Sequence, residues 1–175
     1  MRLADAITLI QAADISKASA ATWADLGCGN GMFTYALAHL LAPYSTIYAV
    51  DRSVQRLQPV TSTNVEVVFR QADFIREALS LPPLDGILMA NSLHYVRDKA
   101  SLVERLKTYL GDNGMFIIVE YDTLKANPWA PYPVDSASLQ QLFSVAGFTT
   151  MKRLGERPSV YHHCTLYACQ FKNKE

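Results

Sequence analysis

A short glycine-rich stretch carries the residues best suited to binding a ligand. Residues 25–31 read Asp-Leu-Gly-Cys-Gly-Asn-Gly and lie where an apolar strand pattern changes to a helical one. Glycines two residues apart let the backbone turn tightly, and they carry no Cβ that would block a ligand. The unpaired N–H groups at the start of the next helix point toward the same place. The stretch therefore predicts a turn that binds a ligand through its backbone.

Asp51 adds a carboxylate near this turn. It ends the second predicted strand, twenty residues after Gly31, where a carboxylate can accept hydrogen bonds from both hydroxyls of a ribose. A dinucleotide-binding turn follows G-x-G-x-x-G, but Met32 stands at the third glycine position. A nicotinamide-dependent oxidoreductase is therefore disfavoured, and a glycine turn without a ligand is the other alternative.

Polar and aromatic side chains follow two later predicted strands. His94 and Tyr95 come after the fourth strand, and Glu120, Tyr121 and Asp122 end the fifth. Open α/β sheets bind ligands at these carboxyl ends, and histidine titrates in the range of a base at neutral pH. His94 is thus a candidate base, with a packed or solvent-exposed histidine as the alternative.

Residues 127–133 hold three prolines and two aromatic side chains. Proline stiffens a loop and the rings offer flat apolar area, so this segment predicts one wall of an acceptor pocket. A loop that only covers the sheet edge is the alternative. The candidate substrate-binding residues are Asn127, Trp129 and Tyr132, together with Tyr161 and His163 in the last predicted strand.

The cysteines and neighbouring histidines do not predict a metal site or disulfides. Cys28, Cys164 and Cys169 are odd in number and widely spaced, which indicates reduced thiols. His162 and His163 are adjacent on a predicted strand and would point to opposite faces. At position 28, packing explains a small residue better than redox chemistry does.

The elements that must position these residues alternate along the chain. Predicted strands cover residues 22–26, 46–50, 65–69, 85–90, 115–119, 148–154 and 160–171. Predicted helices cover residues 3–15 and 31–41, a short piece from Ser53 to Pro59, a helix or turn over 74–79, a helix from Asp98 to a stop at Gly111, and one from Asp135 or Ser136 to Gly147. This alternation predicts a parallel sheet with helices on both faces.

The last two strands are joined by only a short loop, whereas a parallel crossover needs a dozen or more residues. They are therefore expected to be antiparallel. Residues 1–175 show no internal repeat or linker, so a single domain is expected, with residues 1–20 as an N-terminal helical cap.

Composition narrows the function classes. Half of the residues are hydrophobic, 18% are charged, and the formal net charge is zero. A nucleic-acid partner is not expected without a basic excess. No apolar run approaches the ~18 residues of a membrane span, and no signal-peptide pattern opens the chain. A cytoplasmic protein without membrane association is expected, and the oligomeric state is left open.

Taken together, these motifs resemble those of class I S-adenosylmethionine-dependent methyltransferases. Residues 25–31 match the acid-x-Gly-x-Gly-x-Gly motif, and residues 48–51 look like the second motif. Residues 71–74 look like the third, and residues 91–95 like the segment beneath the methionine portion of the cofactor. Residues 110–114 look like the turn before the fifth strand.

This resemblance implies a doubly wound, Rossmann-like sheet of seven strands, mostly parallel, with an antiparallel C-terminal hairpin. It implies S-adenosyl-L-methionine as cofactor, with the acid of the third motif near the adenine amino group. Capping of the following helix is the alternative role for Asp73. The implied cofactor-binding residues are Asp25, Gly27, Cys28, Gly29, Asn30, Gly31, Phe33, Asp51, Arg52, Asp73, Phe74, Asn91, Ser92 and His94.

The same resemblance leaves a small-molecule methyl acceptor by elimination. Residues 91–94 lack the Asn/Asp-Pro-Pro-aromatic pattern of base and glutamine methylation, the paired-glutamate loop of protein arginine enzymes is absent, and no large recognition insertion is found. A base is needed only when the nucleophile arrives protonated; the catalytic candidates are His94, Tyr95 and Tyr121. A non-catalytic cofactor-binding module or partner subunit is the alternative function.

Overall fold

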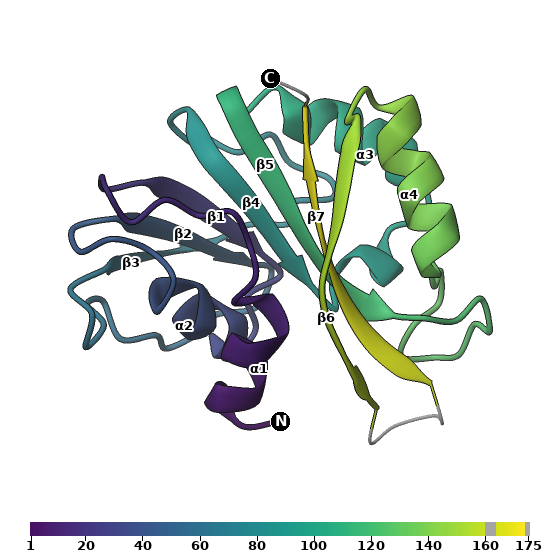
Figure 1. The fold of residues 1–175 in the computed structure, drawn as a ribbon, viewed down its shortest axis with the longest axis horizontal. Helices are drawn as coiled ribbons and strands as arrows, with labels where there is room; N and C mark the ends of the chain where they lie inside the picture. The colour runs from purple at the N-terminus through teal and green to yellow at the C-terminus, as the bar shows by residue number, and fades with distance from the viewer. Residues whose placement is uncertain (160–163, 174–175) are drawn as a thin grey trace.

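The computed structural model describes residues 1–159 and 164–173, which form a seven-stranded sheet in the order β3-β2-β1-β4-β5-β7-β6 (Figure 1). The strands are β1 (Thr22–Leu26), β2 (Thr46–Asp51), β3 (Glu66–Gln71), β4 (Leu84–Ala90), β5 (Leu110–Tyr121), β6 (Thr150–Pro158) and β7 (Thr165–Lys172). Strands β1 to β5 pair in parallel, and β7 runs antiparallel to both β5 and β6. The predicted doubly wound fold with its antiparallel hairpin is confirmed.

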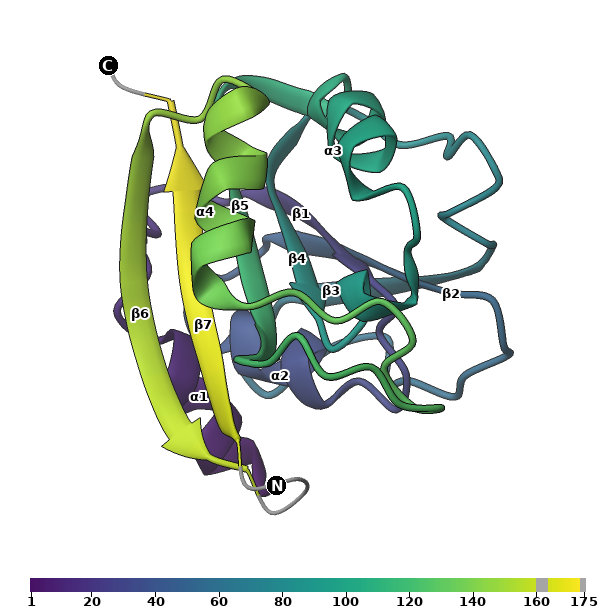
Figure 2. The same ribbon diagram turned by 90° about the vertical axis from the view of Figure 1, so that its right-hand side faces the viewer.

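Helices cover both faces of the sheet (Figures 1 and 2). One face is covered by α1 (Leu3–Ile10) and α2 (Met32–Ala38), and the other by α3 (Lys99–Lys107) and α4 (Ser136–Val145). Alternate residues of β5 serve the two layers: Phe116 and Ile118 pack toward α3 and α4, whereas Ile117 and Val119 pack toward α1 and α2. This two-sided burial explains the continuous apolar run in β5.

The predicted caps of the two long helices are confirmed. The Asp98 side chain accepts from the Ser101 N–H at 3.0 Å, and the Asp135 side chain accepts from the Ser138 N–H at 2.8 Å. Gly147 follows α4 with a φ of 95°, which suits a helix end. The stop at Gly111 is wrong, because α3 ends at Lys107 and Gly111 already belongs to β5.

The first predicted helix is shorter than expected because tertiary bonds turn the chain away from it. The helix ends at Ile10 rather than at residue 15. Beyond it, the Asp14 N–H donates to Gln170 Oε1 at 2.7 Å, and the Asp14 carboxylate accepts from Gln170 and pairs with Lys152.

The helix predicted after Ser53 is absent. The Ser53 N–H donates to Asp51 Oδ1 at 2.9 Å, so the chain makes a local turn there. Val54 is 69% exposed, and the segment therefore buries no continuous helical face. Residues 74–77 form a turn within the predicted segment 74–79. β7 begins at Thr165, and residues 160–163 of the strand predicted over 160–171 lie outside the described residues.

Gly86 of β4 packs tightly against the core on the α1–α2 side of the sheet. A Cβ added at Gly86 would overlap the indole ring of Trp23, which is 1% exposed. We expect Gly86→Ala to lower the free energy of unfolding by about 1–3 kcal/mol, because a rigid, buried ring must shift. Urea denaturation measures the effect.

The control is Gly111→Ala, where the nearest atom to an added Cβ is Leu84 O at 3.7 Å. That variant should stay within about 0.5 kcal/mol of the wild type. Equal losses in the two variants would contradict the packing argument.

Candidate active site

The glycine turn joins β1 to α2, at the point where the strand order reverses between β1 and β4. Gly27, Gly29 and Gly31 have φ values of 83°, 49° and 84°, a region that side chains rarely adopt. A Cβ on Gly27 would stand 2.5 Å from the Ser92 Cβ, and one on Gly31 would stand 2.9 Å from the Tyr35 ring. A Cβ on Gly29 would meet nothing within 4 Å. Two glycines therefore serve packing, and the middle one faces open space.

Asp51 lies beside this turn, as the sequence predicts. Its Oδ2 accepts from the Gly29 N–H at 2.9 Å, and its Oδ1 accepts from the Ser53 N–H at 2.9 Å. The Gly27 N–H donates to Val50 O at 2.8 Å, which holds the start of the turn against the end of β2. Each carboxylate oxygen keeps further lone-pair capacity for a ligand.

Asp25 lies beneath the turn and is 1% exposed. Its Oδ2 accepts from Thr34 Oγ1 at 2.6 Å, and its Oδ1 has no partner among the described residues. Burial raises the pKa of Asp25 to about 7; the hydrogen bond from Thr34 opposes this rise, and the charge of Asp51 adds to it. Asp25 is therefore a buried carboxyl group that titrates near neutral pH.

The third predicted motif forms a tight turn after β3. Asp73 Oδ1 accepts from the Ile75 N–H at 3.0 Å and so forms a local turn. Among the described residues no helix lies between β3 and β4, so the alternative role of helix capping is wrong, while the contact of Asp73 with adenine stays a prediction. Phe74 is buried, and its ring edge comes within 3.5 Å of the place where a Gly27 Cβ would stand. The turn thus packs directly against the glycine turn.

Arg105 of α3 holds this turn, and sequence reasoning missed it. Its guanidinium donates to three carbonyl oxygens: Phe74 O at 2.6 Å, Ile75 O at 2.9 Å and Glu77 O at 2.9 Å. A single arginine on a helix gives no sequence signal for such a role, because the contact spans about thirty residues.

Asn91 and Ser92 leave β4 toward the same place. Ser92 Oγ donates to Leu26 O at 2.6 Å and so ties the ends of β4 and β1 together. Asn91 has a φ of 54°, and its buried Oδ1 has no partner among the described residues. This orphan oxygen stands ready for a donor from a ligand.

His94 and Glu120 form a buried pair. They are 3% and 1% exposed. The His94 Nδ1 lies 2.7 Å from Glu120 Oε2, and the His94 N–H donates to Glu120 Oε1 at 3.1 Å. The Tyr95 ring lies 4.4 Å from the His94 ring between centroids, and that of Tyr121 lies 6.3 Å away. The three predicted catalytic residues are therefore close together.

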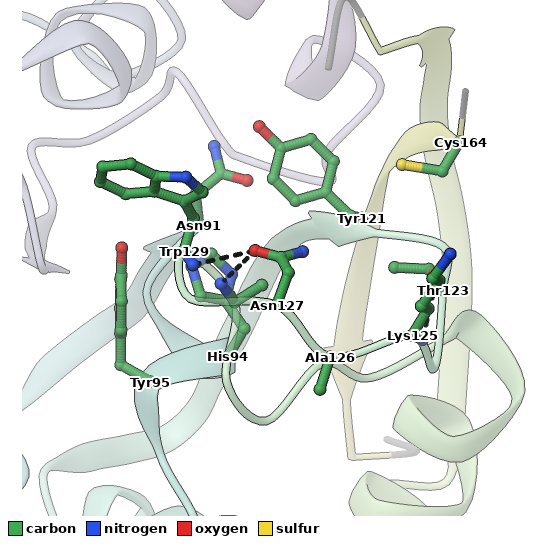
Figure 3. A pocket seen from close by; sticks show the side chains of 11 residues that line it. Asn91, His94, Tyr95, Tyr121, Thr123, Lys125, Ala126, Asn127, Trp129 and Cys164 are labelled. Atoms are coloured by element: carbon green, nitrogen blue, oxygen red, sulfur yellow. Dashed lines mark hydrogen bonds between the residues drawn. The ribbon is translucent and has the colours of Figure 1, made fainter. Parts of the chain in front are cut away.

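A cavity of about 640 Å³ opens beside this pair (Figure 3). Tyr121 and Cys164 stand on one side of it, and Tyr95 and Trp129 on the other. Its lining brings together six residues named in advance, Asn91, His94, Tyr95, Tyr121, Asn127 and Trp129, and adds Thr123, Lys125, Ala126, Ala130 and Cys164. Ala130 belongs to segment 127–133, which the sequence predicts as one wall of the pocket. The other four gave no sequence signal, because only the folded chain brings the loop after β5 and the residue before β7 together.

The residues predicted to bind the substrate have different positions. Asn127 Oδ1 folds its own loop by accepting from the N–H groups of Trp129 and Ala130, at 2.9 and 3.0 Å. Tyr132 is absent from the cavity lining and places its ring 5.9 Å from Lys99 Nζ. Two further predicted residues, Tyr161 and His163, lie outside the described residues.

Three further features bear on packing at position 28, on metal binding and on membrane spans. Cys28 is 7% exposed and packs with Ala49 and Val67. Over residues 1–159 and 164–173, three or more potential metal ligands do not come together at any point. The described helices are all too short or too polar to cross a membrane.

Comparison with known proteins extends these observations. A family model for a methyltransferase domain matches residues 17–167. No curated protein matches the chain. Three solved structures share its fold at low sequence identity, and the shares given are of this chain and then of the other. They are the YcgJ protein of Bacillus subtilis (14% identity, 99% and 98% covered, TM-score 0.69), 1,6-didemethyltoxoflavin-N1-methyltransferase of Burkholderia thailandensis with 1,6-didemethyltoxoflavin and S-adenosylhomocysteine (18%, 99% and 78%, 0.68), and magnesium protoporphyrin IX methyltransferase of Synechocystis PCC 6803 with bound S-adenosylmethionine (16%, 89% and 71%, 0.65).

The buried Asp25 makes stability depend on pH. Its pKa is about 7 in the folded protein and near 3.8 when unfolded, so the folded state holds an extra proton between these values. Stability from this group is therefore greatest at low pH and falls as pH rises toward 7. Asp25→Asn lacks this loss. We expect the free energy of unfolding of the variant, taken relative to that of the wild type, to be about 2–3 kcal/mol higher at pH 8 than at pH 5.

Urea denaturation at both pH values measures this change. The control is Asp112→Asn, an exposed carboxylate, whose difference from the wild type should not depend on pH. A constant difference for Asp25→Asn as well would rule out the raised pKa.

Proposed function

This chain belongs to the methyltransferase-domain family and is an S-adenosyl-L-methionine-dependent methyltransferase, and we propose that it methylates a small-molecule acceptor bound in the cavity beside His94. The observation that carries the proposal is the position of this cavity. Its lining includes Asn91, and the next residue, Ser92, contacts the glycine turn. An acceptor in the cavity is therefore next to the predicted cofactor site.

The residues around the turn suit the cofactor. Gly29 faces open space, the Asp51 carboxylate has capacity for the ribose hydroxyls, and the buried Asn91 Oδ1 lacks a donor. Asp51 would hold the ribose, Phe74 would pack near the adenine, and Asn91 would meet the methionine portion. When bound, the cofactor supplies a methyl group on a positively charged sulfur.

The cavity suits a small, flat acceptor. Its volume of about 640 Å³ lies in the range of sites for small ligands. Tyr95, Tyr121 and Trp129 contribute aromatic rings to its lining, and such rings offer rigid apolar area. A solved methyltransferase of related fold has 1,6-didemethyltoxoflavin and S-adenosylhomocysteine bound, which supports a small-molecule acceptor.

The protein's part in the reaction is to position the acceptor and manage its proton. Orientation of two reactants can supply up to about 7–11 kcal/mol of the barrier. His94 lines the cavity and is the proposed base for an acceptor that arrives protonated. Tyr95 and Tyr121 flank it and would orient the acceptor.

A labelling experiment tests the proposed function. The protein is incubated with cofactor labelled in the methyl group and with separate small-molecule, protein and nucleic-acid fractions of a cell extract. We expect the label in a small molecule whose mass has increased by one methyl group, and none with heat-denatured protein. Label confined to macromolecules would refute the acceptor class. Cofactor binding without any labelled product would favour the non-catalytic module.

Asp51 provides the second test, on the cofactor site. We expect Asp51→Ala to weaken binding of S-adenosylhomocysteine roughly ten- to one-hundredfold, because hydrogen bonds to a charged group contribute about 1.5–3 kcal/mol. Asp51→Asn should fall between this variant and the wild type, since its amide oxygen can still accept one hydrogen bond. Calorimetric titration measures the affinities.

The matched control is Asp85→Ala. This aspartate also accepts from a backbone N–H, that of Thr22 at 2.7 Å, but it lies near the start of β4, away from the turn. Its removal should leave the affinity unchanged. Unchanged affinity in Asp51→Ala would contradict the proposed ribose contact.

A further inference from the structure

We propose that Glu120 is a positioning residue that holds His94 as a neutral base with Nε2 free for the cavity, and that the acceptor is methylated at a hydroxyl or ring N–H. The inference rests on the proposed function and deepens it, because it specifies the chemical state of the acceptor atom.

Glu120 stands where the strand pattern calls for an apolar side chain. It continues the face of β5 that carries Phe116 and Ile118, and its partner across the sheet is Tyr167 of β7. A carboxylate that is 1% exposed is costly to bury unless it is paired and hydrogen-bonded. A leucine or valine would fill the place without this cost, so the carboxylate calls for a specific role.

The hydrogen bonds of the pair define that role. Both Glu120 oxygens are directed to one residue, Oε2 to the His94 ring at Nδ1 and Oε1 to its backbone N–H. A second backbone bond, from the Tyr132 N–H to His94 O at 2.9 Å, fixes the same residue from the loop side. His94 is thus held by hydrogen bonds at its ring, at its backbone N–H and at its backbone carbonyl oxygen.

This arrangement selects one tautomer of the imidazole. An ionised carboxylate only accepts hydrogen bonds, so in a neutral imidazole paired with it Nδ1 carries the proton and Nε2 keeps its lone pair. Within the described chain, Nε2 has no hydrogen-bond partner, and His94 lines the cavity. The free lone pair is therefore available to a group bound there.

Other titratable groups around the pair do not replace this partnership. Tyr95 and Tyr121 flank the ring, and Tyr167 lies near Glu120 on β7. Burial lowers the pKa of Lys99 in α3, and the charge of Glu120 opposes this shift. The Lys99 Nζ donates its hydrogen bonds elsewhere, to Val96 O at 2.8 Å and to Tyr132 O at 2.6 Å. Among the described residues, His94 alone shares a hydrogen bond with the Glu120 carboxylate.

The step that this geometry serves balances without a further reactant. His94 Nε2 takes the proton from the acceptor O–H or N–H as the oxygen or nitrogen forms its bond to the methyl carbon. When bound, the cofactor would supply the methyl carbon, and the electron pair of its carbon–sulfur bond would remain on sulfur as a neutral thioether. The imidazolium is stabilised by the Glu120 carboxylate and then releases its proton to water.

The first test needs no acceptor. Nitrogen-15 NMR of the free protein should show the His94 imidazole as the Nδ1–H tautomer near pH 8. In Glu120→Gln the amide can donate as well as accept, so the Nε2–H tautomer should gain population. Glu104→Gln, at a carboxylate paired with Lys107 on the surface of α3, should leave the spectrum unchanged. A wild-type imidazole in the Nε2–H form would overturn the proposal without any variant.

The second test uses the acceptor identified by labelling. We expect Glu120→Gln to lower kcat about 10- to 100-fold while the affinity for S-adenosylhomocysteine and the KM for the cofactor stay within about twofold. Glu120 acts through His94, so adding Glu120→Gln to His94→Gln should cause no further loss. Additive losses would show that Glu120 does not act through His94.

The outcomes separate this inference from the proposed function. A lack of methylated product from the wild type, with the Nδ1–H tautomer present, would refute the proposed function but not the pairing. A methylated small molecule whose acceptor atom carries no proton before transfer, such as a thioether, would refute the inference and leave the proposed function standing.

Discussion

The close approach of the first and fourth strands at their carboxyl ends is the constraint on which the site depends. Ser92 Oγ donates to Leu26 O at 2.6 Å, and Gly27 has no room for a side chain beside it. Beyond this contact the backbone has positive φ values at Gly27, Gly29 and Gly31, and the Gly29 N–H donates to the Asp51 carboxylate. Asn91 comes just before Ser92 in the chain, and the short helix η1 (Leu93–Tyr95) follows directly after Ser92. One close contact thus sets the position of the glycine turn and the start of the cavity wall.

Two buried carboxyl groups near this edge differ in their hydrogen-bond partners. Asp25 has one hydroxyl partner and one empty oxygen, and burial raises its pKa to about 7. Glu120 is equally buried, but it meets an imidazole and a backbone N–H. A cationic ligand nearby would favour the ionised form of Asp25, whereas Glu120 already has hydrogen-bond partners for both of its oxygens in the fold. The two groups therefore suit different tasks.

Features that depend on local patterns could be predicted from the sequence. The first strand, the helix caps at Asp98 and Asp135 and the hairpin follow from short-range signals that the structure retains. The strand ends are less well predicted, because β5 begins five residues before its predicted start and β6 ends four residues after its predicted end. The helix expected after Ser53 failed because an aspartate two residues earlier bonds its N–H. Arg105 and the Glu120–His94 bond join residues 26 or more positions apart. Sequence periodicity does not indicate such tertiary pairs. The sequence therefore predicts His94 near the site but does not predict Glu120 as its partner.

The loop between β5 and α4 explains why the acceptor is harder to infer than the cofactor. Its ends are fixed: Asp122 accepts from the Ser136 N–H at 2.9 Å, and Lys99 donates to Tyr132 O at 2.6 Å. Between them, Leu124 and Trp129 are 64% and 75% exposed, and few buried contacts constrain them. A segment anchored in this way can change its side chains at little cost to stability. The turn after β1 has no such freedom, because packing against β4 and α2 occupies two of its three glycine positions. The proposed acceptor site therefore lies where folding constrains the sequence least, and the proposed cofactor site where folding constrains it more strongly.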